Sequence, residues 1–250
     1  MFVVKNLTVA LDENEKKVLE SVNISINPGE IHLVMGPNGA GKSTLAKALI
    51  GWDGLNCTGV IKLDSTDISD MEIDTRAREG LFYAAQNPVE VPGVHLVEFL
   101  RNAYNSRKYE NEKIDPWSFT EMFEAVADEL GFDPDFSERN LNEGFSGGEK
   151  KKCEILQMIL LRPRYAVLDE IDSGLDIDSL KRIFSSINKF VKDNGVGIIV
   201  ISHNPKILDY IQPDKVHLLK GGTIVESGDG TLAEKIISKG YAEESKEKTE

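Results

Sequence analysis

The most informative segment of the chain reads Gly36-Pro37-Asn38-Gly39-Ala40-Gly41-Lys42-Ser43-Thr44. It is a complete G-x-x-x-x-G-K-[ST] pattern between two apolar segments. Residues 31–35 suit a short buried strand, and residues 45–50 suit the buried face of a helix. A strand, a glycine-rich loop and a helix in this order are the setting in which the pattern binds nucleotide phosphates. We therefore predict that residues 36–44, called the phosphate loop below, contact a bound nucleotide.

The phosphate loop offers three kinds of group to a nucleotide. Its glycines allow backbone N–H groups to curl around the α- and β-phosphates, and the N-terminus of the following helix adds a positive dipole. Lys42 is expected to reach the β- and γ-phosphates, and Ser43 to place its hydroxyl on Mg²⁺. The alternative, a glycine-rich turn with a surface lysine, is disfavoured because the eight-position pattern is specific in this setting.

Length and composition predict a folded protein of one large domain, or a core with an inserted subdomain. The chain has 250 residues, of which 40% are hydrophobic and 28% charged. No apolar run approaches the roughly 18 to 20 residues that cross a bilayer. The segment Met1-Phe-Val-Val-Lys5 lacks the pattern of a secretory signal, so a cytoplasmic location is expected.

Charge and cysteine content exclude several classes of protein. Lys and Arg number 29 against 42 Asp and Glu, a net charge of −13, which argues against nucleic acid or an anionic membrane as the main partner. Cys57 and Cys153 show neither disulfide nor zinc spacing. Both are expected to be buried, because a free cysteine behaves as a small hydrophobic residue.

The segment before the phosphate loop predicts an antiparallel layer of strands. Residues 2–11 and 18–26 carry strand patterns separated by a polar turn, and Pro28-Gly29 precedes the loop strand. No Tyr, Phe or Trp lies between Val3 and Met35, so contact with the base of the nucleotide is left to aliphatic groups.

The middle of the chain changes from strands to helices. Strands are predicted at 60–63 and 81–84, with a short helix at 75–79 between them, and Gln86 follows the second strand. Two prolines and a glycine make residues 87–95 a shaped loop. A helix opening near Ser118 then carries one apolar face, which we interpret as core rather than subunit contact; its residues are Phe119, Met122, Phe123, Val126, Ala127 and Leu130.

A second candidate phosphate-binding element begins at Ser146. Ser146-Gly147-Gly148-Glu149, called the signature motif below, opens a helical run and offers bare backbone N–H groups to an anion. The basic triplet 150–152 that follows is by itself more typical of a solvated helix face.

Two acidic residues end an apolar strand at 165–168. Asp169 suits a Mg²⁺ shell, and Glu170 suits orienting or deprotonating a water, since neighbours on a strand point in opposite directions. The alternative is a strand capped by solvated acids. After a turn at 172–176 and a helix around 178–191, a strand at 196–201 leads to His203, beside the ends of strands where ligands collect. A structural histidine is the alternative there.

The C-terminal part of the chain is less informative. Residues 215–219 and 223–225 flank Gly221-Gly222 as a hairpin. Residues 241–250 form a polar tail that we predict to be disordered.

The order of these motifs resembles the ATP-binding cassette (ABC) ATPases across nearly the whole chain. The resemblance implies an α/β fold: a P-loop NTPase core with a mixed sheet, an N-terminal antiparallel β layer and an inserted helical subdomain. It implies one domain over 1–240, with its core at 1–87 and 161–240 and the helical subdomain at 88–160. The motifs that carry the resemblance are the phosphate loop, Gln86, the signature motif, Asp169-Glu170, Asp176 and His203.

The resemblance also implies roles for these residues in a Mg²⁺-dependent ATPase. In the family, two cassettes enclose two ATP molecules, so Ser146, Gly147, Gly148 and Glu149 would act on ATP held by a second subunit. Gln86 would sense Mg²⁺ and the γ-phosphate, and His203 would contact the γ-phosphate and the attacking water. Glu170 would be the catalytic carboxylate, and Asp176 would communicate across the dimer.

A narrower resemblance is to the SufC family, the cassette ATPases of the Suf iron–sulfur cluster assembly machinery. Glu149 fits it, whereas Ile171 stands where it leads us to expect Thr. It implies a SufB-type scaffold partner, with or without a SufD-type subunit. Two cysteines cannot supply the four thiolates of a usual cluster, so the cluster would form on the partner. The stretches that carry it are Gln86-Asn-Pro-Val-Glu-Val-Pro-Gly-Val94, Asn142-Glu-Gly-Phe-Ser-Gly-Gly-Glu-Lys-Lys-Lys152, Glu154-Ile-Leu-Gln-Met158, Asp172-Ser-Gly-Leu-Asp-Ile-Asp178, Leu208-Asp-Tyr-Ile-Gln-Pro-Asp214 and Lys239-Gly240-Tyr241.

The main alternative is the ATPase subunit of a membrane transporter, which shares every catalytic motif. The region expected to distinguish the two is the loop after Gln86 with the helices through residue 130, where a partner docks. A cassette ATPase acting on DNA is disfavoured by the net charge and by the absence of a long coiled-coil pattern.

Overall fold

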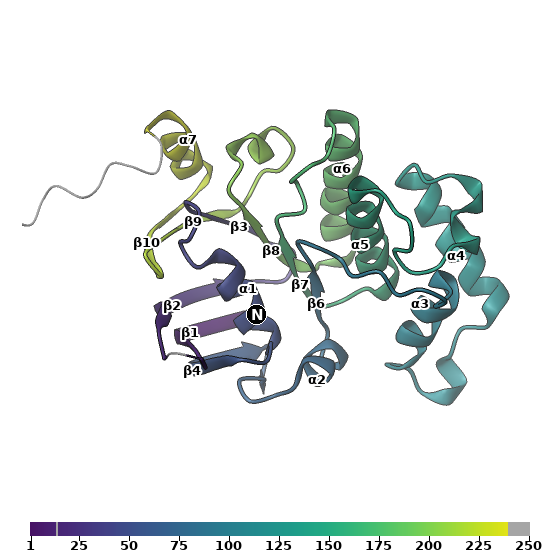
Figure 1. The fold of residues 1–250 in the computed structure, drawn as a ribbon, viewed down its shortest axis with the longest axis horizontal. Coiled ribbons are helices and arrows are strands. Elements are labelled where there is room, and N and C mark those ends of the chain that lie inside the picture. Colours follow the sequence, from purple (N-terminus) through teal and green to yellow (C-terminus); the bar gives the residue numbers. More distant parts are fainter. Residues whose placement is uncertain (14, 240–250) are drawn as a thin grey trace, which may run out of the picture.

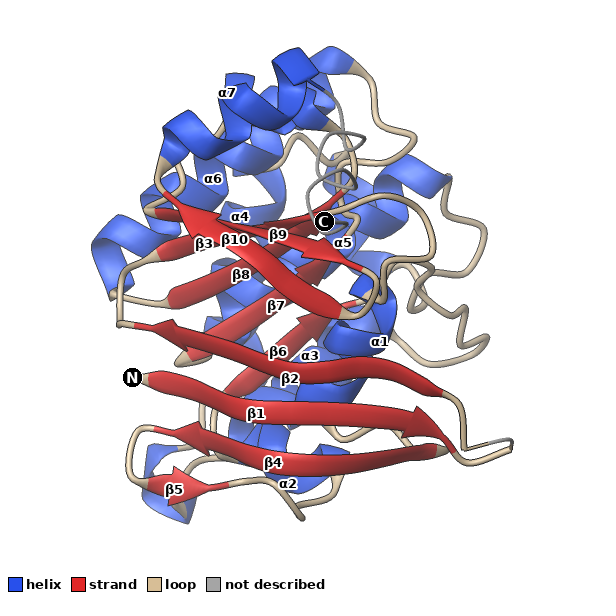
Figure 2. Ribbon diagram, turned by 90° about the vertical axis from the view of Figure 1, so that its left-hand side faces the viewer, coloured by secondary structure: helices blue, strands red, loops and turns tan. Residues whose placement is uncertain are grey.

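The computed structural model describes residues 1–13 and 15–239. Two sheets form the frame of the molecule, and helices cover them (Figures 1 and 2). The predicted polar tail at 241–250, and the Gly240-Tyr241 part of the narrower resemblance, lie outside the described residues.

The first sheet is the predicted N-terminal antiparallel layer. Its order is β2 (Lys17–Ile26), β1 (Phe2–Leu11), β4 (Leu55–Leu63) and β5 (Thr66–Asp67), all antiparallel (Figure 2). β4 is longer than the predicted strand at 60–63, because its first half is polar and exposed and so carries no apolar signal. Cys57 lies in that half and is exposed, so the prediction that both cysteines are buried is wrong; only Cys153 is.

The second sheet carries the motifs. Its strands β3, β6, β7, β8 and β9 are parallel and β10 is antiparallel, so the sheet is mixed, as predicted. All residues of β3, β7 and β8 are buried, which fits central parallel strands covered on both faces. In spatial order the strands are β10 (Thr223–Gly228), β9 (Lys215–Lys220), β3 (Ile31–Met35), β8 (Gly197–Ser202), β7 (Tyr165–Asp169) and β6 (Leu81–Ala84).

Seven α-helices are present in the described part of the chain. α1 packs between the two sheets, because its apolar face meets buried residues of both, for example Leu19 and Val34. Figure 1 shows α3 and α4 on the side away from the antiparallel layer, with α5 and α6 between. The bounds are α1 (Lys42–Ile50), α2 (Ile73–Arg78), α3 (Leu96–Asn105), α4 (Pro116–Glu129), α5 (Gly147–Leu161), α6 (Ile177–Asn194) and α7 (Gly230–Lys239).

The apolar face of α4 is core, as predicted. Phe119, Phe123 and Leu130 are buried in one cluster with residues of α3, α5 and α6. The helix begins at Pro116, slightly earlier than expected, because Asp115 caps it and accepts a hydrogen bond from the backbone N–H of Ser118. The division of the chain at residues 88 and 160 stays a prediction.

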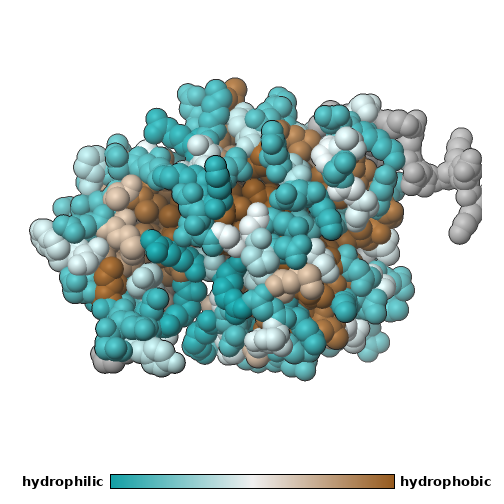
Figure 3. Space-filling model, turned by 180° about the vertical axis from the view of Figure 1, so that it is seen from behind, coloured by the Kyte–Doolittle hydropathy of each residue, from teal (hydrophilic) through white to brown (hydrophobic). Residues whose placement is uncertain are grey.

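The surface shows no single dominant apolar area on the face opposite to that of Figure 1. Apolar side chains reach that face as separate patches among hydrophilic ones (Figure 3). Patches of this kind are ordinary for folded domains. Within residues 1–13 and 15–239, no helix is both long and apolar enough to cross a membrane.

Candidate active site

The phosphate loop joins the end of β3 to the start of α1, in the order that the sequence predicts. Gly36 is required there, since a Cβ atom at this position would lie 2.2 Å from the carbonyl oxygen of Leu219. Gly41 caps α1 with a φ of 102°, a left-handed conformation that favours glycine. The loop therefore opens directly onto a helix N-terminus, where backbone N–H groups without partners in the helix attract anions.

Lys42 folds back over the loop from which it projects. Its Nζ donates to the carbonyl oxygens of Gly36, at 2.9 Å, and Pro37, at 3.1 Å. Burial lowers the pKa of Lys42, and the nearby carboxylates of Glu170 and Asp169 oppose that shift. A buried ammonium group between a loop that binds anions and two carboxylates is well placed to exchange its carbonyl partners for phosphate oxygens.

Asp169 ends β7 and is almost fully buried. Its Oδ2 accepts a hydrogen bond from the Tyr83 hydroxyl at 3.2 Å, while Oδ1 is buried with no hydrogen-bond partner. Burial raises the pKa of Asp169, and the bond from Tyr83 opposes that shift. A buried carboxylate oxygen without a partner is an unusual arrangement that a bound cation would satisfy.

The donor set fits Mg²⁺ better than a metal held entirely by protein side chains. Among the described residues, no group of three or more His, Cys, Asp or Glu is arranged to hold an ion. Mg²⁺ in nucleotide sites uses one or two protein oxygens and completes its shell with phosphates and water. Asp169 provides such an oxygen, and Ser43 and Gln86 stay predicted ligands.

Glu170 lies immediately after β7 in a left-handed conformation, with a φ of 48°. This conformation is uncommon for a residue other than glycine and marks a point where the backbone is constrained. Two side chains from other segments hold the Glu170 carboxylate. Gln86 Nε2 donates to Oε2 at 2.5 Å, and His203 Nδ1 lies 3.0 Å from Oε1. The structure thus brings together three predicted residues that follow β6, β7 and β8.

Lys151 on α5 contacts the backbone of Glu170. Its Nζ donates to the Glu170 carbonyl oxygen and to the Ser173 hydroxyl. Lys151 is 6% exposed, so the interpretation of 150–152 as a solvated face is wrong at this position. The available signal was the spacing: Lys151 is one helical turn before Ile155, on the buried face of α5.

The signature motif starts α5 and satisfies its own polar groups. Ser146 Oγ accepts from the backbone N–H of Glu149 at 3.2 Å, and Glu149 Oε2 accepts from the backbone N–H of Ser146 at 2.8 Å. Arg139 donates to the other Glu149 oxygen at 2.8 Å. Asp176 similarly caps α6 through Ser179. Among the described residues, no hydrogen bond joins the signature motif or Asp176 to the phosphate loop.

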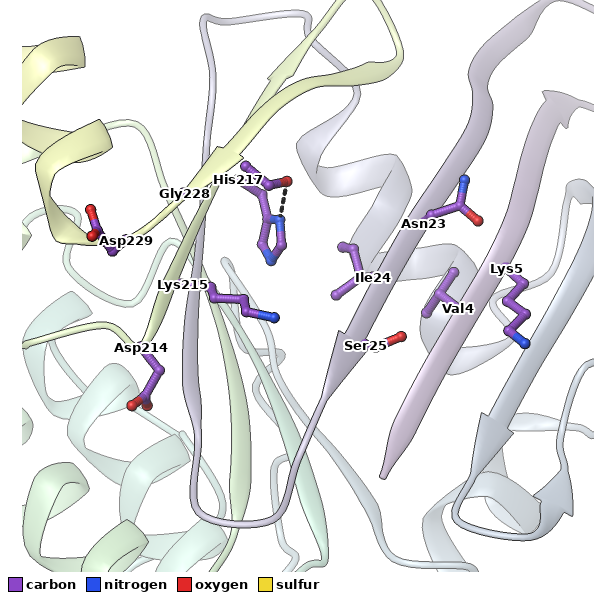
Figure 4. Close-up of a pocket in the computed structure, with 11 residues that line it drawn as sticks. Val4, Lys5, Asn23, Ile24, Ser25, Asp214, Lys215, His217, Gly228 and Asp229 are labelled. Atoms are coloured by element: carbon purple, nitrogen blue, oxygen red, sulfur yellow. Dashed lines mark hydrogen bonds between the residues drawn. The ribbon is translucent and has the colours of Figure 1, made fainter.

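A cavity of about 520 Å³ lies at the junction of the two sheets, away from the phosphate loop (Figure 4). One wall belongs to β1 and β2 and the other to β9, β10 and the residues beside them. It adjoins Asp214 and Lys215, at the start of β9, whereas the phosphate loop follows the end of β3. Since β3 and β9 run parallel, the cavity lies toward the amino ends of these strands and the phosphate loop lies at their carboxyl ends.

A buried chain of hydrogen bonds borders this cavity. His32 lies 3.1 Å from Glu30 through Nε2 and 3.0 Å from His217 through Nδ1. His217 Nδ1 lies 2.8 Å from the Ser227 hydroxyl, the contact that Figure 4 marks with a dashed line. Because the Glu30 carboxylate only accepts, His32 donates to it, His217 donates to His32, and Ser227 donates to His217. Burial lowers the pKa of His217 to about 4, so this histidine is neutral at pH 7.

Comparisons with known proteins show sequence relatives over most of the chain. A profile of the family described as ABC transporter matches residues 19–173. Vegetative protein 296 of Bacillus subtilis is 46% identical over 239 residues, which cover 95% of this chain and 90% of the relative. A probable ABC transporter ATP-binding protein of Streptococcus pyogenes serotype M3 is 45% identical over 240 residues, which cover 96% and 93%.

Solved structures share the fold. The dimeric structure of a bacterial ABC transporter cassette superposes with a TM-score of 0.79, covering 92% of this chain and 98% of that one. At 19% sequence identity, that likeness concerns the fold alone. It confirms the predicted fold class, an α/β core with a mixed sheet, an antiparallel layer and inserted helices.

Proposed function

Because the chain belongs to the ABC transporter family, whose cassettes hydrolyse ATP, we propose that it drives iron–sulfur cluster assembly through ATP-dependent dimerisation. The scaffold is of the SufB type, with or without a SufD-type subunit. The observation that carries the ATPase part is the Glu170 carboxylate held between Gln86 and His203. The scaffold part rests on the stretches that resemble the SufC family, above all the loop after Gln86. A cytoplasmic location belongs to the same proposal.

In the proposed reaction Glu170 accepts the proton of a water as the water attacks the γ-phosphorus of ATP. The bond from the γ-phosphorus to the bridging oxygen breaks, and ADP and phosphate leave. Gln86 and His203 orient the water and Glu170, while Lys42 and the phosphate-loop N–H groups neutralise charge on the phosphates. Mg²⁺, when bound beside Asp169, would supply further neutralisation of the β- and γ-phosphate oxygens.

Dimerisation is part of the proposal because no hydrogen bond joins the signature motif to the phosphate loop of the same chain within residues 1–13 and 15–239. Ser146 caps α5, and its backbone neighbours at 147 and 148 have no Cβ to obstruct an approaching phosphate. A second copy would therefore bring its signature motif to the ATP of the first. The Arg139 guanidinium pairs with Glu149, which limits the repulsion between that carboxylate and phosphate.

The docking region proposed for the scaffold is the loop after Gln86 together with α3. Val89 is 75% exposed, and Val91 and Phe99 are also exposed, beside a loop that several hydrogen bonds hold in shape. Asn142 donates to the Val89 carbonyl oxygen at 2.9 Å, and the Val91 N–H donates to Leu141. Exposed apolar side chains on a braced loop support a protein partner at this place.

The second candidate function is the ATPase subunit of a membrane transporter. The name of the Streptococcus pyogenes relative, a probable ABC transporter ATP-binding protein, favours it. Both functions use the same catalytic residues, so the partner decides between them.

The deciding experiment captures the partner. Tagged chain carrying Glu170→Gln, given ATP and Mg²⁺, is used to pull down proteins from soluble and membrane fractions of a cell extract. Recovery of a soluble SufB-like protein, lost when Val89 and Phe99 are both changed to Asp, is expected. Recovery of a polytopic membrane protein instead would refute the scaffold proposal and leave the ATPase assignment intact.

A further inference from the structure

Glu154 is a buried carboxylate that the reaction described above does not use. It lies on α5, two turns after the signature motif, and is 8% exposed. Its Oε2 accepts from the backbone N–H of Ala85 at 3.2 Å, and its Oε1 accepts from Gln157 Nε2 at 3.3 Å. Both donors are neutral amides, and no ion pair involving Glu154 occurs among residues 1–13 and 15–239.

Ala85 is the residue between β6 and Gln86. β6 is an edge strand of the described sheet, paired only with β7, so its outward N–H groups need partners from outside the sheet. Glu154 provides that partner at the point where the chain leaves β6. The next residue is the one whose amide contacts Glu170.

Lys151 and Glu154 lie three residues apart and therefore on the same face of α5. Lys151 holds the Glu170 backbone, and Glu154 holds the backbone before Gln86. The side chains of Gln86 and Glu170 then meet each other, which closes a ring of contacts. One face of α5 thus makes hydrogen bonds to the backbone at Glu170 and to the backbone next to Gln86.

Burying the Glu154 carboxylate costs free energy of desolvation, so the residue does more than fill space. Burial raises the pKa of Glu154 to about 7, and an apolar residue would fill the same space without desolvating a charge. What the side chain adds, and an apolar residue lacks, is an oxygen that accepts from the backbone N–H of Ala85.

We propose that Glu154 is a positioning residue for ATP hydrolysis, which fixes the backbone at Ala85 and so sets where the Gln86 amide meets the Glu170 carboxylate. It acts through Gln86 and touches neither the nucleotide nor the reacting atoms. The proposal rests on the ATPase part of the proposed function and is independent of which partner docks.

The test compares ATP turnover by the full chain and by the variants E154A, E154Q and E129Q. E154A is expected to lower kcat by about tenfold or more while KM for ATP stays near the wild-type value, because small misplacements near a reacting centre cost rate rather than binding. E154Q keeps an oxygen that accepts from Ala85 and should recover most of the rate. E129Q, which loses an exposed ion pair with Lys189, is the matched control and should behave as wild type.

Hydrogen exchange at the Ala85 amide provides a readout separate from turnover. It should quicken in E154A and stay slow in E154Q and E129Q, since only the first loses the acceptor. If E154A fails to fold, E154D replaces it. Its side chain is one methylene shorter, so it keeps the carboxylate and is too short to contact the Ala85 N–H. A wild-type kcat in folded E154A or E154D, or a rate in E154Q as low as in E154A, would overturn the proposal. Normal dimer trapping by Glu170→Gln alongside such a result would leave the ATPase function standing.

Discussion

Gln86 Nε2 donates a hydrogen bond to Glu170 Oε2 over 2.5 Å, although the two residues are 84 positions apart in the chain. Glu170 has a left-handed backbone conformation and so does not continue the extended backbone of β7, which ends at Asp169. In this conformation its carboxylate contacts Gln86. His203 binds the other carboxylate oxygen, so side chains from two other segments contact both oxygens of Glu170. In the proposed reaction this carboxylate accepts the proton of the attacking water, so a change at Glu170 is expected to act on turnover.

Glu170→Gln is expected to bind ATP normally and to lose at least about 100-fold in turnover, because the amide keeps the shape of the side chain and cannot accept the proton. ATP should then accumulate in a stable dimer, measurable by size-exclusion chromatography with light scattering. The control is Glu226→Gln, which changes an exposed partner of Lys235. Turnover at the wild-type rate would assign the base to another residue.

Lys42→Ala is expected to weaken ATP binding by about 100-fold or more, since it removes a buried ammonium group from the phosphates. Isothermal titration with ATP and Mg²⁺ measures the effect. Lys47→Ala is the matched control: Lys47 is on the same helix but faces Trp52, with Nζ 5.7 Å from the centre of the ring. An unchanged affinity in Lys42→Ala would refute the assignment of the phosphate loop.

The isolated chain is expected to be a slow ATPase whose specific activity rises with protein concentration. Ser146 caps α5 of its own chain through a hydrogen bond from the backbone N–H of Glu149. In the proposed dimer the signature motif that contacts an ATP belongs to the second chain, and an isolated chain lacks that motif. Specific activity measured over about a hundredfold range of concentration tests this, and Ser146→Arg should flatten the curve by blocking the approach of the partner. Fast turnover independent of concentration would show that one chain is sufficient.

The sequence predicted the parts of the site that are determined locally. A pattern of eight positions predicts the roles of the glycines and Lys42, and the structure places the loop between β3 and α1 as expected. The three central strands are apolar runs of a recognisable length. Their parallel arrangement then implies that residues at their carboxyl ends come together, and Glu170 and His203 do so.

Contacts between distant segments were beyond the reach of sequence patterns. The spacing of Lys151 on α5 marked a buried position, but nothing local indicated that it would hold Glu170. Cys57 was predicted buried from its residue type, whereas the partner strands of β4 leave that position exposed. The helix α7 went unpredicted although Leu232, Ala233 and Ile236 have helical spacing and are buried.

His217 is expected to make stability depend on pH on the acidic side. Burial, with a contribution from His32, lowers the pKa of His217 to about 4 from the 6.5 of an unperturbed histidine. Between these values the unfolded chain binds a proton that the native chain rejects, so the free energy of unfolding falls as pH drops from about 6.5 to 4, by about 3 kcal/mol. Urea unfolding of the wild type and of His217→Gln at pH 7 and pH 4.5 measures this. The stability difference between the two should shrink at the lower pH, and a constant difference would contradict the assignment.

Glu154 is expected to act in the opposite direction. Burial raises its pKa to about 7 from the 4.5 of an unperturbed glutamate. Between these values the native chain keeps a proton that the unfolded chain releases. The free energy of unfolding therefore falls as pH rises through this interval, by about 3 kcal/mol in total, and stays reduced above pH 7. E154Q is neutral at every pH and lacks this loss.

The measurement is again a difference between two variants, because all other titrating groups cancel in it. Urea unfolding at pH 5 and pH 8.5 should show E154Q gaining on the wild type by about 2 to 3 kcal/mol at the higher pH. E129Q, whose carboxylate is exposed, should keep a nearly constant difference from the wild type. If E154Q and the wild type keep the same difference at both pH values, Glu154 is ionised in the native chain at pH 5. The carboxylate would then be stabilised by a partner other than Ala85 and Gln157.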